Sequence, residues 1–280
     1  MTSTGEIVFK MSGSGNDFVF VDGRSSPPET WDAARIREMC DRRNGLGADG
    51  FAILEPGEAS GHIRFHFFNS DGRRAPMCGN GTLCATRMAR WLELVAADDM
   101  VLETDAGEMF TRVLPGPEQR SELKLGITPE LSRPDGIELR EGEHSIHFTT
   151  VGVPHLVLVV ADVAAVAVEQ RGRELRHHDA MVPLGANVNF VSRAGSDWAM
   201  RTYERGVEAE TLACGTGAVA CAAVLLASGQ AELPWNVRTT SGRVLTVTGT
   251  VTAAGVIQQP CLIGEGRLVL RAVVLPERTS

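Results

Sequence analysis

The chain contains one short motif twice, as Met77-Cys78-Gly79-Asn80-Gly81-Thr82 and as Ala213-Cys214-Gly215-Thr216-Gly217-Ala218. Both copies read Cys-Gly-x-Gly, and about half of the 280 residues separate them. A hydrophobic pattern of the helical kind follows each copy directly. An internal duplication would leave one such motif in each of two similar domains, so the repeat predicts a two-domain protein with a matched pair of cysteines.

The residues after each motif predict a helix. After Cys78, apolar residues recur at helical spacing and form the stripe of an amphipathic helix; they are Cys84, Met88, Trp91, Leu92 and Val95. After Cys214, the stretch from Val219 to Ala227 is apolar throughout, so we expect that helix to be buried on all sides. Ser228-Gly229 is a reasonable signal for its end.

Each cysteine therefore lies at or just before the start of a helix. Glycines next to it let the backbone approach a ligand closely. The unpaired N–H groups of a first helical turn can bind an anion such as a carboxylate. The positive end of the helix dipole also lowers the pKa of a thiol, which makes the thiolate accessible near neutral pH.

Two such thiols related by a repeat suit a reaction that inverts a stereocentre. One thiolate would remove a proton from one face of a carbon while the other thiol returns a proton to the opposite face. The alternative is that both cysteines are small buried apolar residues beside glycine-rich turns. The matched position of Cys78 and Cys214 favours the catalytic interpretation.

The composition narrows the class of protein. Hydrophobic residues make up 43% and charged residues 22%, which are values of a globular protein, and the formal charge is −8 without a basic run. This charge argues against nucleic acid or an anionic membrane as partner. The six cysteines form no disulfide framework and lack the spacing of a zinc site, so we predict no metal and reduced thiols in the cytoplasm.

The sequence also predicts no membrane attachment and no export. The segment from Thr2 to Lys10 lacks the apolar core of a signal peptide. The most apolar stretch, from Leu156 to Val168, is too short to span a bilayer and contains Asp162.

The halves match beyond the cysteines. Asn16 and Val153 precede the two cysteines at nearly equal distances, as do Asn69 and Arg205. The pattern of many strands around one helix per half predicts an α+β protein of two pseudo-symmetric β-rich domains, each a sheet or barrel around a central helix. We expect the active site in the cleft between them.

The predicted domains are residues 1–120, to which 266–280 return, and residues 121–265. Two further helices are expected outside the central pair. One runs from Trp31 to Arg42 with Thr30 as its cap, and the other runs from Val163 to Arg171.

At these motifs the sequence resembles the diaminopimelate epimerases, a family that works without pyridoxal phosphate. The resemblance covers nearly the whole chain and rests on several motifs in the same order: Gly15-Asn16-Asp17-Phe18, Gly45-Leu46-Gly47-Ala48-Asp49-Gly50, Phe68-Asn69-Ser70-Asp71-Gly72, Met77-Cys78-Gly79-Asn80-Gly81, Pro154-His155, Asn187-Val188, and Tyr203-Glu204-Arg205-Gly206 through Ala213-Cys214-Gly215-Thr216-Gly217.

The resemblance implies a cofactor-free homodimeric isomerase that interconverts LL- and meso-2,6-diaminopimelate on the way to lysine and peptidoglycan. Cys78 and Cys214 would be the acid/base thiols, and His155 and Glu204 would tune their pKa values. The α-carboxylate would be held by Gly79, Asn80, Gly215 and Thr216. The rest of the substrate would be bound by Asn16, Asn69, Asn187, Glu204 and Arg205.

Departures from the family pattern leave other substrates open. Val153 stands where Asn is frequent, Gly50 where Gln is frequent, and Leu83 where Arg is usual, and the loop at Glu208-Ala209 is one residue longer. Alternatives are a racemase or epimerase of histidine or hydroxyproline, or an isomerase of the phenazine-biosynthesis type, in which a carboxylate would replace the thiol pair. A non-catalytic amino-acid-binding protein or a thiol redox sensor is the alternative from another class.

Overall fold

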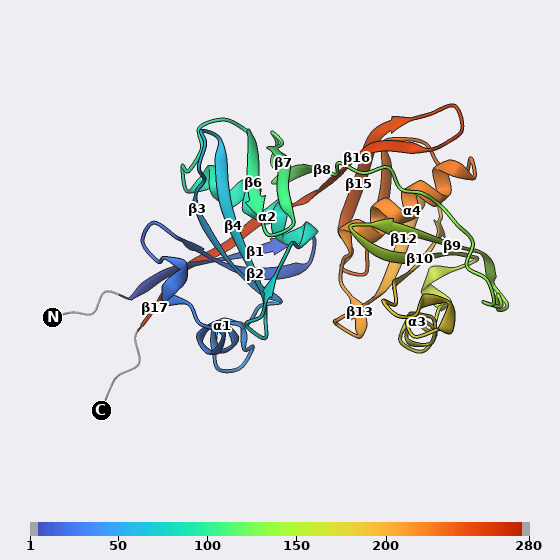
Figure 1. Cartoon of the computed structure of the whole chain (residues 1–280), viewed down its shortest axis with the longest axis horizontal. Coiled ribbons are helices and arrows are strands. Elements are labelled where there is room, and N and C mark those ends of the chain that lie inside the picture. Colours follow the sequence, from blue (N-terminus) through green and yellow to red (C-terminus); the bar gives the residue numbers. More distant parts are fainter. Residues whose placement is uncertain (1–4, 276–280) are drawn as a thin grey trace. The chain divides into compact units, whose positions relative to one another are not determined.

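The computed structural model describes residues 5–275 and divides into two units of similar construction (Figure 1). Unit 1 runs to Leu123 and resumes at Gly264, and unit 2 is Lys124–Ile263. The two boundaries fall within strands β8 (Arg120–Lys124) and β16 (Ile257–Glu265).

Unit 1 is a set of strands around one long helix, with a short helix outside. Its elements are β1 (Glu6–Gly13), β2 (Asn16–Asp22), the 3-10 turn η1 (Pro28–Thr30), α1 (Ala33–Cys40), β3 (Gly50–Pro56), β4 (His62–Asn69), β5 (Arg74–Ala75), α2 (Gly79–Trp91), β6 (Asp99–Thr104), β7 (Gly107–Val113) and β17 (Arg267–Val274). The last strand, β17, pairs antiparallel with β1, so the two ends of the described chain lie side by side in this unit.

Unit 2 repeats this construction. Its elements are β9 (Glu143–Val151), β10 (Val153–Val160), the 3-10 turn η2 (Val163–Ala165), α3 (Val168–Arg176), the 3-10 turn η3 (Asp179–Met181), β11 (Asn187–Ala194), β12 (Asp197–Glu204), β13 (Ala209–Thr211), α4 (Gly215–Ala227), β14 (Trp235–Arg238) and β15 (Val244–Val251).

The strand pairings of the two units correspond one to one. In unit 1, β2 pairs parallel with β3, β3 antiparallel with β4, and β4 parallel with β6. In unit 2, β10 pairs parallel with β11, β11 antiparallel with β12, and β12 parallel with β14. The predicted fold class, two pseudo-symmetric β-rich domains around central helices, is confirmed in this respect.

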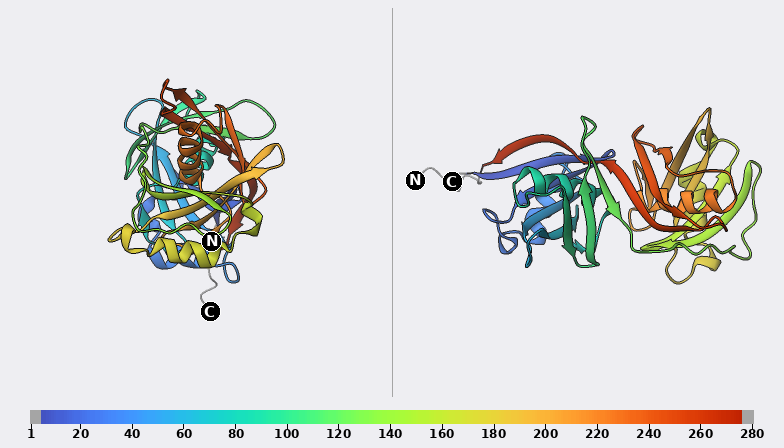
Figure 2. Two further views of the ribbon diagram at one scale, coloured as in Figure 1. Left: turned by 90° about the vertical axis from the view of Figure 1, so that its right-hand side faces the viewer. Right: turned by 90° about the horizontal axis from the view of Figure 1, so that it is seen from above.

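Each central helix is enclosed by the strands of its own unit. Helix α2 contacts β1, β2, β3, β4, β6, β7 and β17, and α4 contacts β9, β10, β11 and β15. Figure 2 shows α4, in orange, among the strands of unit 2. From Gly217 to Leu226 every residue of α4 is buried, which confirms the prediction from its unbroken apolar sequence. Its C-cap is Ser228, followed by Gly229 in the left-handed region at φ 68°.

The first central helix is more deeply buried than its sequence pattern predicts. We expected an amphipathic helix, yet nine of the 13 residues of α2 are buried, and Trp91 of the expected apolar stripe is 51% exposed. Two polar residues of α2, Thr82 and Thr86, are buried because their hydroxyls have hydrogen-bond partners on the helix. Thr82 Oγ donates to the Cys78 carbonyl at 2.9 Å, and Thr86 Oγ donates to the Thr82 carbonyl at 2.8 Å. Hydrogen bonds to the helix backbone satisfy both hydroxyls, so burying them carries little cost.

Two predicted helix boundaries were wrong. Helix α1 begins at Ala33 because Asp32 is the cap and accepts from the Arg35 N–H at 2.8 Å, whereas Thr30 Oγ donates back to Pro27 O. The run predicted as one helix from Val163 divides into the short turn η2 and helix α3, which continues to Arg176.

Tyr203 explains why α3 extends beyond the predicted end. A Cβ at Gly172 of α3 would lie 2.3 Å from the Tyr203 Cβ, so glycine lets α3 lie directly on β12. The helix is therefore stabilised by tertiary packing at a residue whose own propensity disfavours helix.

We expect Leu225→Ala to lower the free energy of unfolding by about 2–5 kcal/mol, because a fully buried leucine leaves a cavity when truncated. Leu225 is 0% exposed inside α4, whereas Leu184 is 64% exposed. Chemical denaturation measures the change, and Leu184→Ala is the matched control, expected within about 0.5 kcal/mol of the unchanged protein. Equal effects of the two substitutions would contradict the enclosed position of α4.

Candidate functional site

Cys78 is the N-cap of α2. Its backbone is extended (φ −139°, ψ 119°), and its carbonyl accepts from the Thr82 N–H at 2.7 Å, which is the first hydrogen bond of the helix. Gly79 is the first residue of the helix, and Asn80 in the first turn is buried. The predicted anion-binding residues of unit 1 therefore lie where unpaired helical N–H groups are found.

The turn that carries Asn16 lies against this helix start. Gly13 pairs with Asn16 across the β1–β2 turn, and a Cβ at Gly13 would lie 2.7 Å from the Asn80 carbonyl and 3.0 Å from Cys84 Sγ. Asn16 thus begins β2 beside the first turn of α2. Only glycine permits that close approach, so the structure places the turn that carries Asn16 against the helix turn that carries Asn80.

A cluster of charged side chains holds the same turn in place. The Arg42 guanidinium contacts Asp17 at 2.8 Å and Asp49 at 2.7 Å, and Lys10 Nζ lies 2.9 Å from Asp17. Burial raises the pKa of the Asp17 carboxyl, but hydrogen bonds and charge from Arg42 and Lys10 outweigh burial and hold it below its usual value. Sequence analysis found the motifs of Asp17 and Asp49 but missed that Arg42 joins them.

The predicted Asn69 is the exposed last residue of β4, and it pairs with Gly50 on β3. Gly50 is one of the departures from the family pattern. A Cβ at this position would lie 2.8 Å from the Phe67 ring and 2.8 Å from the Phe68 carbonyl. Glycine is therefore required here, because Phe67 fills the space into which a side chain at position 50 would project.

Cys214 is the N-cap of α4, as Cys78 is of α2. Its backbone is extended (φ −124°, ψ 107°), its carbonyl accepts from the Ala218 N–H at 3.0 Å, and it is 5% exposed. Its sulfur lies 3.6 Å from Thr216 Oγ. Gly215 and Thr216 form the first turn, so the structure brings together the predicted residues of this half as well.

Asn187, Glu204 and Arg205 also gather in unit 2. Asn187 begins β11, and its side-chain oxygen accepts from the Arg205 backbone N–H at 2.7 Å. Arg205 also donates from its guanidinium to the Leu184 carbonyl at 3.2 Å. Glu204 is the last residue of β12.

The strand register corrects one detail of the repeat. Equal spacing from the cysteines matches Asn69 with Arg205, but the strand pairing differs. Asn69 lies opposite Gly50, the first residue of β3. In unit 2, Tyr203 lies opposite Val188, so Glu204, the next residue, is level with Asn187 at the start of β11. The position equivalent to Asn69 is therefore Glu204, because the loop before Cys214 is one residue longer.

His155 is fully buried in β10, beside Asn187 of the parallel strand β11. Burial, helped by the nearby positive charge of Arg205, lowers the pKa of His155 to about 3. The ring is therefore neutral near pH 7. Its Nδ1 lies 3.1 Å from the side-chain nitrogen of Asn189, a residue that sequence analysis did not select.

The remaining buried cysteines differ from the N-cap pair. Burial raises the pKa of Cys40 to about 12 and raises those of Cys84 and Cys221 well above the ordinary value. These thiols are protonated at neutral pH, so they are poorly suited to act as thiolate bases.

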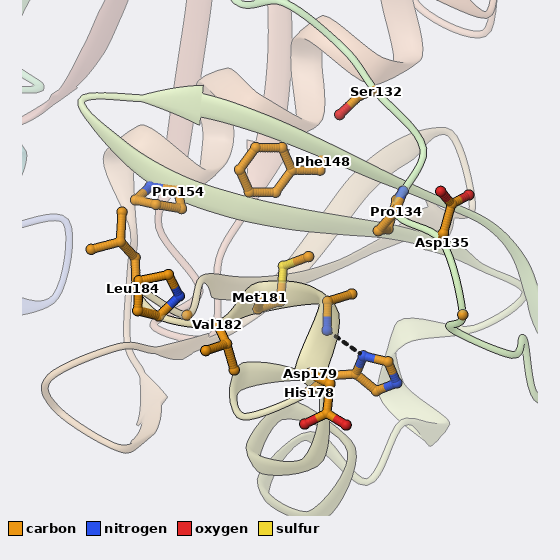
Figure 3. A pocket seen from close by; sticks show the side chains of 14 residues that line it. Ser132, Pro134, Asp135, Phe148, Pro154, His178, Asp179, Met181, Val182 and Leu184 are labelled. Carbon is orange, nitrogen blue, oxygen red and sulfur yellow. Dashed lines mark hydrogen bonds between the residues drawn. The ribbon is translucent and has the colours of Figure 1, made fainter.

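Unit 2 also contains a cavity of about 790 Å³ that is separate from the predicted residues (Figure 3). Phe148 and Pro154 line one side, and Met181, Val182 and Leu184 line another. His178 Nδ1 accepts from the Ala180 N–H at 3.1 Å, so this histidine closes the η3 turn. The cavity contains no cysteine and none of the predicted substrate-binding residues, so it is not the site of the expected chemistry.

Within residues 5–275, no three side chains of the His, Cys, Asp and Glu types lie close enough to hold a metal ion. In the same described part of the chain, no helix is long and apolar enough to cross a membrane.

Comparison with known proteins decides the family. The family model for diaminopimelate epimerase matches residues 8–120 and 147–258, one segment in each unit. The chain belongs to the diaminopimelate epimerase family. Among relatives in this family, the diaminopimelate epimerase of Gemmatimonas aurantiaca is 42% identical over 275 residues, which are 95% of this chain and 98% of the relative. That of Aquifex aeolicus is 42% identical over 251 residues, or 85% of this chain and 88% of the relative.

Solved structures with much lower sequence identity to this chain share its fold. A phenazine biosynthesis protein of the PhzF family from Bacillus anthracis superposes with a TM-score of 0.71 at 15% identity, covering 97% of this chain and 99% of that one. A probable proline racemase from Agrobacterium radiobacter K84 gives a TM-score of 0.69 at 16% identity, covering 98% and 94%. These matches confirm the fold class that the sequence predicted.

Proposed function

We propose that this chain is an isomerase that interconverts LL- and meso-2,6-diaminopimelate, with Cys78 and Cys214 as its two acid/base groups. The observation that carries the proposal is the equivalence of the two cysteines. Each is the N-cap of a buried helix, at the same place in two units with the same strand pairings, in a chain of the diaminopimelate epimerase family.

The proposed reaction needs no redox change. One thiolate takes the α-proton of the substrate and becomes a thiol, while the opposite thiol gives its proton to the other face of the carbon and becomes a thiolate. The carbon keeps one C–H bond with inverted configuration, and the enzyme ends with the protonation states of its two cysteines exchanged. Either direction of the reaction follows from the same pair of groups.

Negative charge that develops toward the α-carboxylate would be stabilised by the first turns of both helices. Gly79 and Asn80 of α2 and Gly215 and Thr216 of α4 lie in these turns. Their backbone N–H groups are fixed before the reaction begins, so stabilising the transition state requires little rearrangement. This supports cofactor-free removal of a weakly acidic proton.

The remaining predicted residues would bind the second amino-acid end of the substrate. Asn16, Asn69 and Asn187 offer amides, while Glu204 and Arg205 offer opposite charges for an ammonium and a carboxylate. His155 and Glu204 would lie near the thiols and tune their reactivity. The Asn187–Arg205 hydrogen bond at 2.7 Å supports a joint role of these two residues.

A homodimer, a location in the cytoplasm and a place in lysine and peptidoglycan precursor synthesis are parts of the same proposal. Their support is the family to which the chain belongs. Sedimentation at several protein concentrations tests the dimer directly.

The substrate is tested by incubating the enzyme in heavy water with a panel of amino acids. We expect deuterium at the α-position of diaminopimelate, together with conversion of LL to meso, and none in histidine or hydroxyproline. The distal carboxylate and ammonium of diaminopimelate are the groups that Arg205 and Glu204 would bind. Deuterium in hydroxyproline or histidine alone would contradict the proposed substrate, and no exchange with any amino acid would contradict an epimerase.

A further inference from the structure

A fully buried amide lies behind the start of α4. Asn189 on β11 is 0% exposed and makes three hydrogen bonds. Its nitrogen donates to the Leu156 carbonyl at 2.9 Å and lies 3.1 Å from His155 Nδ1, and its oxygen accepts from Thr202 Oγ at 3.0 Å. The residue is also close to the cysteine helix, since a Cβ at Gly217 would lie 2.3 Å from Asn189 Oδ1 and 3.2 Å from Cys214 Sγ.

These contacts determine which way the amide points. The Leu156 carbonyl can only accept a hydrogen bond, so the NH2 group of Asn189 must face it. The same NH2 group therefore faces His155 and donates to Nδ1. A neutral imidazole that accepts at Nδ1 carries its proton on Nε2.

The Nε2 atom is consequently a buried donor. It has no hydrogen-bond partner among the described residues of the structure. A buried N–H group without an acceptor is costly, so it calls for an explanation, and a reacting group that supplies the acceptor is one.

Comparison with unit 1 shows that the fold does not require this polar network. By strand register, the positions of His155, Asn189 and Thr202 correspond to Phe18, Ala52 and Phe67. The Phe18 and Phe67 rings are 5.8 Å apart and edge-on, so the same place behind α2 is filled by an apolar contact. Unit 1 folds with apolar residues at these three positions, so the fold does not require the buried polar side chains of unit 2. Their presence indicates a role in the reaction.

We propose that Asn189 is a positioning residue that holds His155 as the Nε2–H tautomer, so that the ring donates a hydrogen bond to a catalytic thiolate. This inference rests on the proposed function of the two cysteines. It assigns His155 the role of a neutral donor that stabilises a thiolate and excludes the role of a base that removes a thiol proton, because its only nitrogen without a partner already carries a proton.

The tautomer is measured by nitrogen NMR on protein labelled with 15N-histidine. The His155 signals are assigned as those lost in His155→Gln. We expect the wild-type ring to be neutral at pH 7, with the proton on Nε2 and none on Nδ1. A wild-type ring protonated on Nδ1 would overturn the inference, and this measurement needs no variant at position 189.

Asn189→Asp tests the link to the reaction. A carboxylate cannot donate to Nδ1, so we expect the ring proton to move to Nδ1 and the Nε2 donor to be lost. We expect kcat to fall about 10- to 100-fold, the effect of one hydrogen bond to a charged group, with a much smaller change in KM. One of the two cysteines should also react more slowly with iodoacetamide at pH 7.

Thr202→Val is the matched control. It removes a hydrogen bond from the other end of the same amide and leaves both bonds of the Asn189 nitrogen in place. We expect the Nε2–H tautomer to remain and the loss of kcat to be much smaller than in Asn189→Asp. If both variants lost activity equally with the tautomer unchanged, Asn189 would be structural and the inference would fail.

The outcomes separate this inference from the proposed function. A wild-type enzyme that epimerises diaminopimelate but keeps full rate and thiol reactivity in Asn189→Asp overturns the inference alone. If the wild-type protein has the expected tautomer and Asn189→Asp shows the expected loss of thiol reactivity, but the wild-type protein does not epimerise diaminopimelate, the proposed function is overturned and the positioning role of Asn189 is supported.

Discussion

Replacing Cys78 or Cys214 with alanine is expected to reduce the epimerisation of diaminopimelate about 100- to 10,000-fold, the usual contribution of one general acid or base. Inversion needs a proton acceptor on one face and a donor on the other, and each substitution removes one of them. The rate of conversion of LL- to meso-diaminopimelate measures the loss.

Deuterium exchange gives a sharper result for the same two variants. Each retains one thiol, so each should exchange the α-proton from one face only. We expect Cys78→Ala to exchange with one stereoisomer and Cys214→Ala with the other, without inversion. A single variant that exchanges both stereoisomers would contradict the assignment of one thiol to each face.

Cys261→Ala is the matched control for these variants. Cys261 lies in β16, is partly exposed and is not part of either Cys-Gly-x-Gly motif. Its loss should leave the conversion rate within about twofold, as expected for a substitution away from the reacting groups. Full activity in either Cys78→Ala or Cys214→Ala would refute the two-thiol mechanism.

Gly217→Ala is expected to have the second largest effect, with kcat reduced at least about 100-fold, because small displacements of reacting groups are this costly. The new Cβ would lie 2.3 Å from Asn189 Oδ1 and 3.2 Å from Cys214 Sγ. The three hydrogen bonds of Asn189 prevent it from moving aside cheaply, so α4 must shift and carry the cysteine with it.

Stability should respond less than activity to this change. Alanine favours a helix over glycine by about 1 kcal/mol, which offsets part of an overpacking cost of about 1–3 kcal/mol. Gly81→Ala at the equivalent position of α2 is the control, since its nearest neighbour would be the Phe67 ring at 3.1 Å. Chemical denaturation measures the change in stability, and kcat measures the change in activity. A larger loss of activity in Gly81→Ala than in Gly217→Ala would contradict the account.

Much of the fold followed from local patterns in the sequence. The two Cys-Gly-x-Gly motifs do precede helices, and the apolar run after Cys214 is a buried helix. The motif residues Asn69-Ser70-Asp71-Gly72 form a turn between two paired strands, with Gly72 N–H donating to the Asn69 carbonyl. These features depend on residues close together in the chain, which is why one sequence was enough.

The errors arose where distant residues compete with local signals. The amphipathic pattern after Cys78 predicted an exposed polar face for this helix, but strands from distant parts of unit 1 surround α2, and Thr82 and Thr86 are buried with their hydroxyls bonded to the helix backbone. The end predicted for the helix after Val163 was wrong because Gly172 packs on Tyr203, more than thirty positions further along the chain.

The sequence by itself determined the duplicated architecture, the family and the pair of cysteines at helix starts, since each of these is written in the order and spacing of neighbouring residues. Only the tertiary structure decided which side chains lie behind each cysteine helix. His155, Asn189 and Thr202 come from three different strands, and Phe18, Ala52 and Phe67 from the equivalent three. Strand register brings each set together, and register is a property of the assembled sheet that no single stretch of sequence carries.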